Sequence, residues 1–410
     1  MRSQHYPVSK LSESYYIFLV IMFTGAFFPL LTRGTDGSDG ESGVIYLLVF
    51  MMIYMIYMLY FDLNEFLGAF LQNKLLFALI TYVTVSFLWS ELAEVSLKRS
   101  IMFCLSSLIG ISIGYRMNVL SILKISQIAL LIITLSSMAI IFLMGDLGKM
   151  DETQNMGMHM GAWKGVFIHK NKFGKVMSMQ ILVNGFLYMV YHKKRYLIPI
   201  LLSFVCIYNS DSTSALLIAL LNLLFLTVCR FSLRKENIIL FVMLSILAVV
   251  FTVFFLDIEA FFGLFGKESD LTGRVPLWIV LLDFFEKKPW LGYGFESFWM
   301  NEEILHIVWT QMSWENIYQA HNGFIDVLIG TGIIGFLLLT ILLFYTFFSG
   351  ISLVKKQLDY TYLWSIAFLF FFLTYNLIES TSIKHNDIFW LFFVVTIALH
   401  NRVNKSNKSK

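Results

Sequence analysis

Long apolar runs recur along the whole chain, and they limit its possible folds more than any other feature of the sequence. Runs of roughly 18 or more apolar residues are long enough to cross a bilayer as helices. Hydrophobic residues make up 58% of the 410 residues and charged residues only 14%, against about 45–50% and about 25% in soluble domains. The sequence therefore predicts an all-α polytopic membrane protein in which residues 1–410 form a single transmembrane domain.

The apolar runs predict about twelve spans by the length criterion of roughly 20 residues. An even number of spans places both termini on one side of the membrane. The short basic segments fall on that side, which the positive-inside rule identifies as cytoplasmic: His192–Arg195, Arg230–Lys235, Lys355–Lys356 and Arg402–Lys410. The approximate span ranges are about 14–32, 43–61, 74–90, 100–116, 119–144, 172–191, 196–210, 213–231, 237–256, 323–349, 360–379 and 386–400.

Two longer polar stretches fall on the opposite, periplasmic side of this topology. The first is residues 145–172, and the second, between the ninth and tenth predicted spans, is residues 257–322. Long connections of this kind usually carry a function. Few ionisable residues lie deep inside the predicted spans, whereas proton- or ion-coupled transporters usually carry some. The charge pattern therefore indicates chemistry or binding at the outer edge of the bilayer.

Each of these two stretches delivers a histidine and an asparagine to the expected start of a helix. The first pair is His169 and Asn171, and the second is His321 and Asn322. The free N–H groups and the dipole at a helix start favour an anion, and Asn322 is a suitable N-cap. A neutral His321 can accept a proton from an attacking hydroxyl, so we expect it to be catalytic.

Positively charged residues of the same two stretches are candidate phosphate ligands. Arg274 can hold a phosphate through two hydrogen bonds from its planar guanidinium group. Lys170 and Lys172 add positive charge without that geometry. Together, these residues predict a cationic pocket at the lipid–water boundary that suits a lipid pyrophosphate.

Other residues near these candidates have simpler interpretations. Arg274 opens an amphipathic segment, with an apolar side expected at Trp278, Leu282 and Phe285. We expect Trp299, Trp309 and Trp314 to anchor the chain at the membrane interface. The glycines of the GYGF segment at residues 292–295 allow a sharp turn or a close approach to another surface. Asp326 follows His321 by more than one helical turn, so the spacing only weakly indicates an orienting role.

Neither a metal site nor a cofactor site is predicted. The three cysteines match no metal-binding spacing, and no nucleotide-binding fingerprint is present. The basic tail is interpreted as a determinant of topology rather than as a nucleic-acid contact.

Four segments, taken in order on one predicted face, resemble a known family. They are WKGVFIHKNKFG (163–174), LTGRVPLW (271–278), EKKPWLGYGFESFW (286–299) and AHNGFIDVLIGTGIIG (320–335). The set is similar to the O-antigen ligase/Wzy polymerase superfamily. Within it, the set most resembles exopolysaccharide polymerases of the ExoQ type.

The resemblance implies a GT-C-like fold and a metal-independent glycosyltransferase of the bacterial inner membrane. Such enzymes use glycans carried on undecaprenyl pyrophosphate at the periplasmic face. By the resemblance, Arg274 binds the pyrophosphate and His321 serves the acceptor. Thr272 stands where the family often has serine, and it keeps the hydroxyl. Where the family often has a second outer-loop arginine, this sequence offers lysines: Lys164, Lys170 and Lys172. Further substrate contacts are expected from His169, Asn171 and Asn322.

We therefore expect a polymerase that joins lipid-linked repeat units of an O-antigen, capsule or exopolysaccharide. A ligase that passes the glycan to lipid A–core or another acceptor is the alternative within the same enzyme class. A lipid-linked sugar transporter or flippase also fits about twelve spans, but the two halves of the sequence show no repeat of the kind that many transporters have. The expected partners are the lipid-linked donor and acceptor glycans and membrane lipids, with a chain-length regulator and a separate flippase as further candidates.

Overall fold

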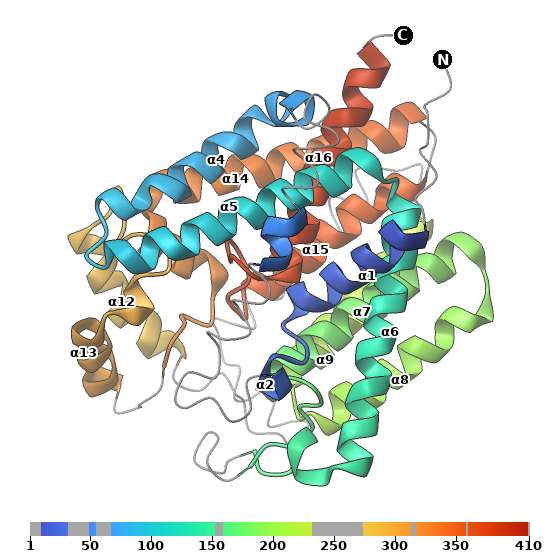
Figure 1. Cartoon of the computed structure of the whole chain (residues 1–410), viewed down its shortest axis with the longest axis horizontal. Helices are drawn as coiled ribbons and strands as arrows, with labels where there is room; N and C mark the ends of the chain where they lie inside the picture. Colours follow the sequence, from blue (N-terminus) through green and yellow to red (C-terminus); the bar gives the residue numbers. More distant parts are fainter. Residues whose placement is uncertain are drawn as a thin grey trace. The chain divides into compact units, whose positions relative to one another are not determined.

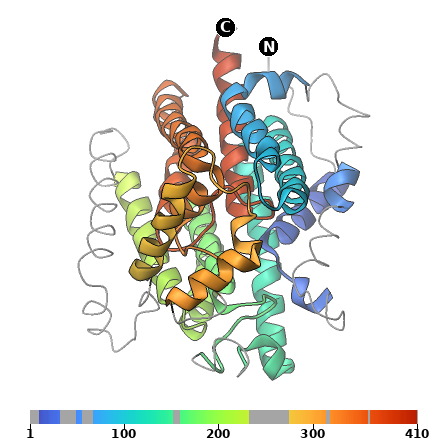
Figure 2. The same cartoon turned by 90° about the vertical axis from the view of Figure 1, so that its left-hand side faces the viewer.

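The computed structural model describes residues 10–31, 49–54, 67–151, 159–231, 274–312, 317–357 and 360–408. Within these ranges the secondary structure is helical, apart from one isolated β-bridge between Lys149 and Trp163. The prediction of an all-α fold is confirmed for this part of the chain. Figures 1 and 2 show the helices in two perpendicular views.

The described residues fall into two compact units, each built from segments that are far apart in the sequence. Those of the first unit lie within Met1–Ile53, Arg116–Val242 and Val354–Phe368, and those of the second lie within Tyr54–Tyr115, Met243–Leu353 and Leu369–Lys410. The described part of residues 145–172 therefore belongs to the first unit. The described part of residues 257–322 belongs to the second.

The first unit is a helical bundle around α7, which contacts α6, α8 and α9 (Figure 1). Its helices are α1 (Lys10–Thr24), α2 (Phe28–Leu31), α6 (Val119–Leu143), α7 (Lys170–Tyr191), α8 (Leu197–Asn209) and α9 (Thr213–Phe231), with short 3-10 turns at Gly145–Gly148, Lys194–Tyr196 and Tyr360–Tyr362. Phe173, Met177, Leu182 and Phe186 of α7 are fully buried, as expected for a helix that neighbours enclose.

The second unit contains the remaining helices. They are α4 (Lys74–Val85), α5 (Ala93–Arg116), α12 (Arg274–Lys287), α13 (Glu302–Met312), α14 (Gly323–Gln357), α15 (Leu363–Asn376) and α16 (Ile388–Lys408), with 3-10 turns at Ser86–Leu88 and Phe298–Met300. The end of α14 and the start of α15 are assigned to the first unit. Aromatic rings join α15 to α16, as in the pair Phe371 and Phe389, whose ring centroids are 4.9 Å apart.

Small residues bring α5 close to α16 in the second unit. Gly110 and Gly114 are four residues apart on α5, the small-xxx-small spacing that lets membrane helices approach each other. A Cβ atom added at Gly114 would lie 2.5 Å from the carbonyl oxygen of Val395 and 2.8 Å from the Cβ of Ala398. Glycine at position 114 is therefore a condition of this helix contact.

α14 is broken at Gly332, whose φ of 65° and ψ of −170° are not helical. The break leaves backbone groups that the segment before it in sequence satisfies. The Tyr293 N–H donates to the Ile329 carbonyl (2.9 Å), and the Ile333 N–H donates to the Pro289 carbonyl (2.8 Å). The predicted close approach of the GYGF segment to another surface is confirmed, and that surface is the break in α14.

Five helices within the described ranges are long and apolar enough to cross a membrane. They are Ala93–Arg116, Val119–Leu143, Lys170–Tyr191, Thr213–Arg230 and Gly323–Lys356. The chain is thus a polytopic membrane protein. The count of about twelve spans stays a prediction, and the predicted span at about 237–256 lies outside the described residues.

The contact between α5 and α16 gives a test of the fold. Gly114→Ala should lower the melting temperature of the purified protein in detergent, because overpacking a tight contact costs about 1–3 kcal/mol. The matched control is Gly68→Ala, also in a helix, where the added Cβ would meet only the Gln72 side chain at 4.0 Å. The control should be neutral or slightly stabilising. Equal melting temperatures for the two variants would contradict a close α5–α16 contact.

Candidate functional site

The candidate site is organised around the start of α14. Asn322 caps this helix, and its Oδ1 accepts hydrogen bonds from the N–H groups of Phe324 (3.0 Å) and Ile325 (3.2 Å). The predicted N-cap is therefore confirmed. The preceding residue, His321, has a φ of 50°. A residue other than glycine rarely adopts this left-handed conformation, and it persists only where the surroundings hold it.

Side chains from three elements hold the backbone just before His321. The Ala320 N–H donates to Oδ1 of Asp326 (3.1 Å), and the Ala320 carbonyl accepts from Nε1 of Trp278 (2.8 Å). The indole of Trp299 donates to the same Asp326 oxygen (2.8 Å). Asp326 thus fixes the loop that leads to His321, and no contact described here joins it to the imidazole.

The expectation that Trp299 anchors the chain at the membrane interface is wrong. Trp299 is only 7% exposed and belongs to a hydrophobic core that α12, α13 and the adjoining loops form together with Ile329 of α14. Trp309 is partly buried and donates to the Ile317 carbonyl (3.0 Å), and Trp314 lies outside the described residues. The error arose because an aromatic residue in a polar segment fits an interface belt and a local core equally well.

The buried face of α12 also differs from the prediction. Trp278 is buried as expected, but Leu282 is 45% exposed. The buried positions on this helix instead share the face of its first residue: Arg274, Leu277, Trp278, Leu281 and Phe284. The buried face differs from the predicted one because α12 turns the side that carries Arg274 toward the interior. Leu282 lies about a quarter turn away from the buried Leu281, so it points outward.

Arg274 and His321 meet at one carboxylate, that of Glu379. Nη2 of Arg274 lies 3.5 Å from Oε1 of Glu379, and Nδ1 of His321 lies 3.3 Å from Oε2. Arg274 also donates from Nη1 to the Ile378 carbonyl. Gln319 donates from Nε2 to Oε2 of Glu379 (3.1 Å). Arg274 and Glu379 are both buried, so the two charges face each other where water screens them little.

Sequence reasoning did not single out Glu379. This residue follows α15, at the end of the predicted span 360–379 and before the polar segment STSIKHND. An ionisable residue at the edge of a span is a functional candidate by default, because placing a charged group near the membrane interior costs free energy and such residues usually have a functional role. That rule, applied to each end of each predicted span, would have identified Glu379.

The first unit holds the other predicted pair. α7 begins at Lys170, and its N-cap is His169, whose Nδ1 accepts from the Asn171 N–H (3.2 Å). The prediction that both His–Asn pairs stand at helix starts is therefore confirmed. The capping residue differs between them: it is the histidine in α7 and the asparagine in α14.

The predicted lysines differ in their surroundings. Lys170 is only 1% exposed and donates from Nζ to the Asp211 carbonyl (3.0 Å). Burial lowers the pKa of the Lys164 ammonium group, and Asp151 partly opposes this effect. The side chain of Lys172 lies against Gly25. A Cβ atom added at Gly25 would lie 2.6 Å from Nζ of Lys172.

These three lysines lie in the first unit, whereas Arg274 and His321 lie in the second. A pocket that combines the two sets stays a prediction. Thr272 lies outside the described residues.

A second buried carboxylate, Glu296, lies in the same unit as Arg274. Its oxygens are 2.6 Å from Nδ1 of His385, 3.6 Å from Nη1 of Arg99 and 3.9 Å from Nζ of Lys384. Burial alone would raise the pKa of Glu296, but the nearby positive charges of His385, Lys384 and Arg99 outweigh it and hold this pKa well below its usual range. Glu296 is therefore ionised at neutral pH and links α5 to the segment after α15.

The lowered pKa of Glu296 predicts how stability depends on pH. A carboxylate with a depressed folded-state pKa stabilises the fold above its unfolded-state pKa of roughly 4.3, and this contribution is lost as the pH falls toward the folded-state value. Glu296→Gln should cost about 3–5 kcal/mol at pH 7, because it leaves buried cations without their partner. The gap between the melting temperatures of variant and wild type, measured from pH 7 to pH 3, should be constant above about pH 5 and should narrow steadily as the pH falls below roughly 4.3.

The matched control for this titration is Glu94→Gln on α5, where an exposed carboxylate pairs with Lys98. Its melting temperature should stay close to that of wild type throughout. A stability loss in Glu296→Gln that is the same at pH 7 and pH 3 would contradict the assignment to the ionised carboxylate.

Three of the four segments that first suggested a family, all except residues 163–174, fall within the range that a family model matches. The family model described as O-antigen ligase matches residues 198–340, a range that includes Arg274 and His321 and ends before Glu379. The chain is also similar to the exopolysaccharide production protein ExoQ of Rhizobium meliloti (strain 1021). The two are 26% identical over 356 residues, which cover 81% of this chain and 78% of that protein. The resemblance of this chain to the O-antigen ligase/Wzy polymerase superfamily, and to ExoQ within it, is thereby confirmed.

Proposed function

We propose that the protein is a polysaccharide polymerase, a membrane glycosyltransferase that joins repeat units carried on undecaprenyl pyrophosphate. The observation that carries the proposal is the convergence of Arg274 and His321 on Glu379 beside the start of α14. Similarity to the O-antigen ligase family and to a protein of exopolysaccharide production supports a polymerase or ligase role. The proposed location is the periplasmic face of the bacterial inner membrane, with both termini cytoplasmic.

Arg274 is proposed to bind the leaving pyrophosphate. Its guanidinium group already contacts an anionic partner, Glu379, and a backbone carbonyl in the buried site. A pyrophosphate offers the same kind of oxygen acceptors with more charge, so it can compete for the guanidinium group. Charge that is positioned before the reaction, where negative charge develops, is often the largest catalytic contribution. The start of α14 adds its dipole to this charge.

His321 is proposed to be the general base. Gln319 uses its amide N–H to donate to Oε2 of Glu379, so the simplest pattern has Nδ1–H of His321 donating to the same carboxylate oxygen. Nε2 then carries the lone pair and is the acceptor. A carboxylate that holds an imidazole in this tautomer also stabilises the cation that forms when the proton arrives.

In the proposed reaction a hydroxyl oxygen of the acceptor sugar attacks the anomeric carbon of the donor. Its proton passes to Nε2 of His321 as the new glycosidic bond forms. The bond between the anomeric carbon and the pyrophosphate oxygen breaks, and the lipid pyrophosphate leaves with the bonding electrons, next to Arg274. Holding two lipid-tethered substrates together would supply much of the remaining rate enhancement.

A ligase would use the same residues with a different acceptor, such as lipid A–core. The match to a family described as O-antigen ligase favours this second candidate, whereas the similarity to an exopolysaccharide production protein favours the polymerase. The product distinguishes them, because a polymerase yields lipid-linked chains of many repeat units and a ligase yields glycan joined to the new acceptor.

The central test concerns His321. His321→Ala should cut chain elongation on the order of 10²-fold or more, the contribution typical of a general base. Gel analysis of lipid-linked and surface glycans at matched membrane abundance should show single repeat units in place of a ladder. Export of the single units should continue, because the flippase is a separate protein in this proposal.

His321→Asn is the control for a purely structural role. Asparagine tolerates the left-handed backbone conformation better than most residues, so this variant should keep the local fold while losing the imidazole. It should fail to elongate as His321→Ala does. A full ladder from His321→Asn would contradict the catalytic role. Glu379→Gln should also reduce elongation, because it removes the charge that stabilises the imidazolium.

A separate prediction concerns the geometry of the phosphate contact. Arg274→Lys should lose most of the polymer, because lysine keeps the charge but cannot present two parallel donors to a phosphate. The matched control is Arg195→Lys, the same change at an exposed position of the first unit. The control should make polymer of normal length. Normal length in Arg274→Lys, at equal membrane abundance, would show that the paired donors are not needed.

A further inference from the structure

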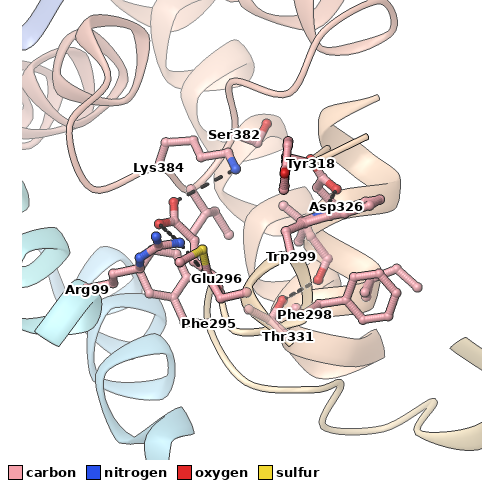
Figure 3. Close-up of a pocket in the computed structure, with 15 residues that line it drawn as sticks. Arg99, Phe295, Glu296, Phe298, Trp299, Tyr318, Asp326, Thr331, Ser382 and Lys384 are labelled. Atoms are coloured by element: carbon pink, nitrogen blue, oxygen red, sulfur yellow. Dashed lines mark hydrogen bonds and ion pairs between the residues drawn. The ribbon is translucent and has the colours of Figure 1, made fainter. Parts of the chain in front are cut away.

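A cavity of about 250 Å³ lies in the second unit, next to the candidate site but separate from it. Its lining includes Arg99, Glu296, Trp299, Tyr318, Asp326 and Ser382, and Figure 3 shows these side chains around it. Arg274, His321 and Glu379 do not line it. The cavity and the candidate site nevertheless share two chain segments, because Tyr318 lies three residues before His321 and Ser382 lies three residues after Glu379.

Two buried polar atoms in the lining have no hydrogen-bond partner among the residues that the structure describes. One is Oγ of Ser382, a residue that is only 2% exposed, and the other is Oδ2 of Asp326. Oδ1 of Asp326 is already used by Ala320 and Trp299. Buried polar groups are nearly always hydrogen-bonded in folded proteins. These two atoms therefore indicate a ligand that carries both donors and acceptors.

The charges in the lining argue against an anion as that ligand. Arg99 and Lys384 are positive, but Glu296 pairs with both of them, at 3.6 Å and 3.9 Å. Asp326 supplies a second carboxylate. With two cations and two carboxylates, the lining has no net formal charge. This balance favours a neutral ligand with hydroxyl groups over a phosphate or pyrophosphate.

The size and the aromatic walls narrow the choice further. Phe295, Phe298 and Trp299 supply apolar surface beside the polar groups, the mixture that is typical of small-molecule sites. The volume is below the roughly 300–1,000 Å³ of pockets for drug-sized ligands. It suits one sugar ring, which has hydroxyl groups at its edge and C–H groups on its faces, rather than a long glycan or a lipid chain.

We propose that this cavity is a subsite for one neutral pyranose ring of the acceptor glycan. Asp326 and Ser382 hold its hydroxyl groups, and the aromatic side chains cover its faces. The assignment to the acceptor rests on the proposed function, in which His321 takes the acceptor's proton. An occupant held between the segments of Tyr318 and Ser382 lies beside His321, where the attacking hydroxyl must be presented.

The test is a binding measurement that does not require catalysis. Purified full-length protein in nanodiscs is titrated with methyl glucopyranosides, galactopyranosides and mannopyranosides of both anomers, and ligand-observed NMR reports binding. At least one glycoside should bind to wild type. Ser382→Ala should weaken this binding roughly 3- to 10-fold, the loss expected for one hydrogen bond.

Ser380→Ala is the matched control. Ser380 is also buried, and its hydroxyl has no partner within the described ranges, but it does not line the cavity. This variant should bind the glycoside as wild type does. Samples with equal melting temperatures are compared, so a folding defect is not mistaken for lost binding.

The remaining outcomes separate this proposal from the proposed function. Binding of no pyranoside, equal binding by Ser382→Ala and Ser380→Ala, or displacement of the glycoside by inorganic pyrophosphate would each overturn the subsite. His321→Ala should bind the glycoside normally. If His321→Ala instead makes full-length polymer while Ser382→Ala still loses binding, the proposed catalytic role fails and the sugar subsite stands.

Discussion

The break in α14 at Gly332 fixes the large polar segment to the membrane helices of the second unit. A broken helix exposes backbone N–H and C=O groups, which need partners wherever lipid replaces water. The turn at residues 289–293 supplies these partners through Tyr293 and Pro289. With that turn anchored, Trp299 reaches Asp326 and Trp278 reaches the carbonyl of Ala320. The same polar segment thus contacts α14 at Ile329 and Ile333, eight and twelve residues after His321, and holds the backbone just before His321.

One carboxylate connects the two groups that the proposed reaction needs. Glu379 contacts both Arg274 and His321. A change in the position or charge of one of these residues therefore alters the interaction of the other with the same carboxylate. When a pyrophosphate competes for Arg274, Glu379 keeps its contact with the imidazole. In this proposal, the donor and the acceptor are coupled through Glu379, because the pyrophosphate binds one of its partners and the attacking hydroxyl gives its proton to the other.

Hydrophobic run length predicted the all-α membrane fold, and helix-start chemistry predicted the positions of Asn322 and His169, because both depend on neighbours in the sequence. Contacts between distant segments were not predictable in this way. Glu379 lies 58 residues after His321, and no local pattern relates the two. Trp299 was misassigned for the same reason, since the core that buries it is built from several segments. The GYGF glycines indicated a close approach but not the helix that they would meet.

The histidines of the two histidine–asparagine motifs differ in position by one residue relative to the helix that follows. In α7 the histidine occupies the N-cap, so its ring bonds to the backbone of its own helix. In α14 the asparagine takes that position, and the histidine, one place earlier, extends to a carboxylate from another part of the chain. The histidine thus caps the start of a helix in one case and links two distant segments in the other. Distance to the first helical residue, rather than the identity of the motif, decides whether the histidine ring contacts the backbone of its own helix or a carboxylate far along the chain.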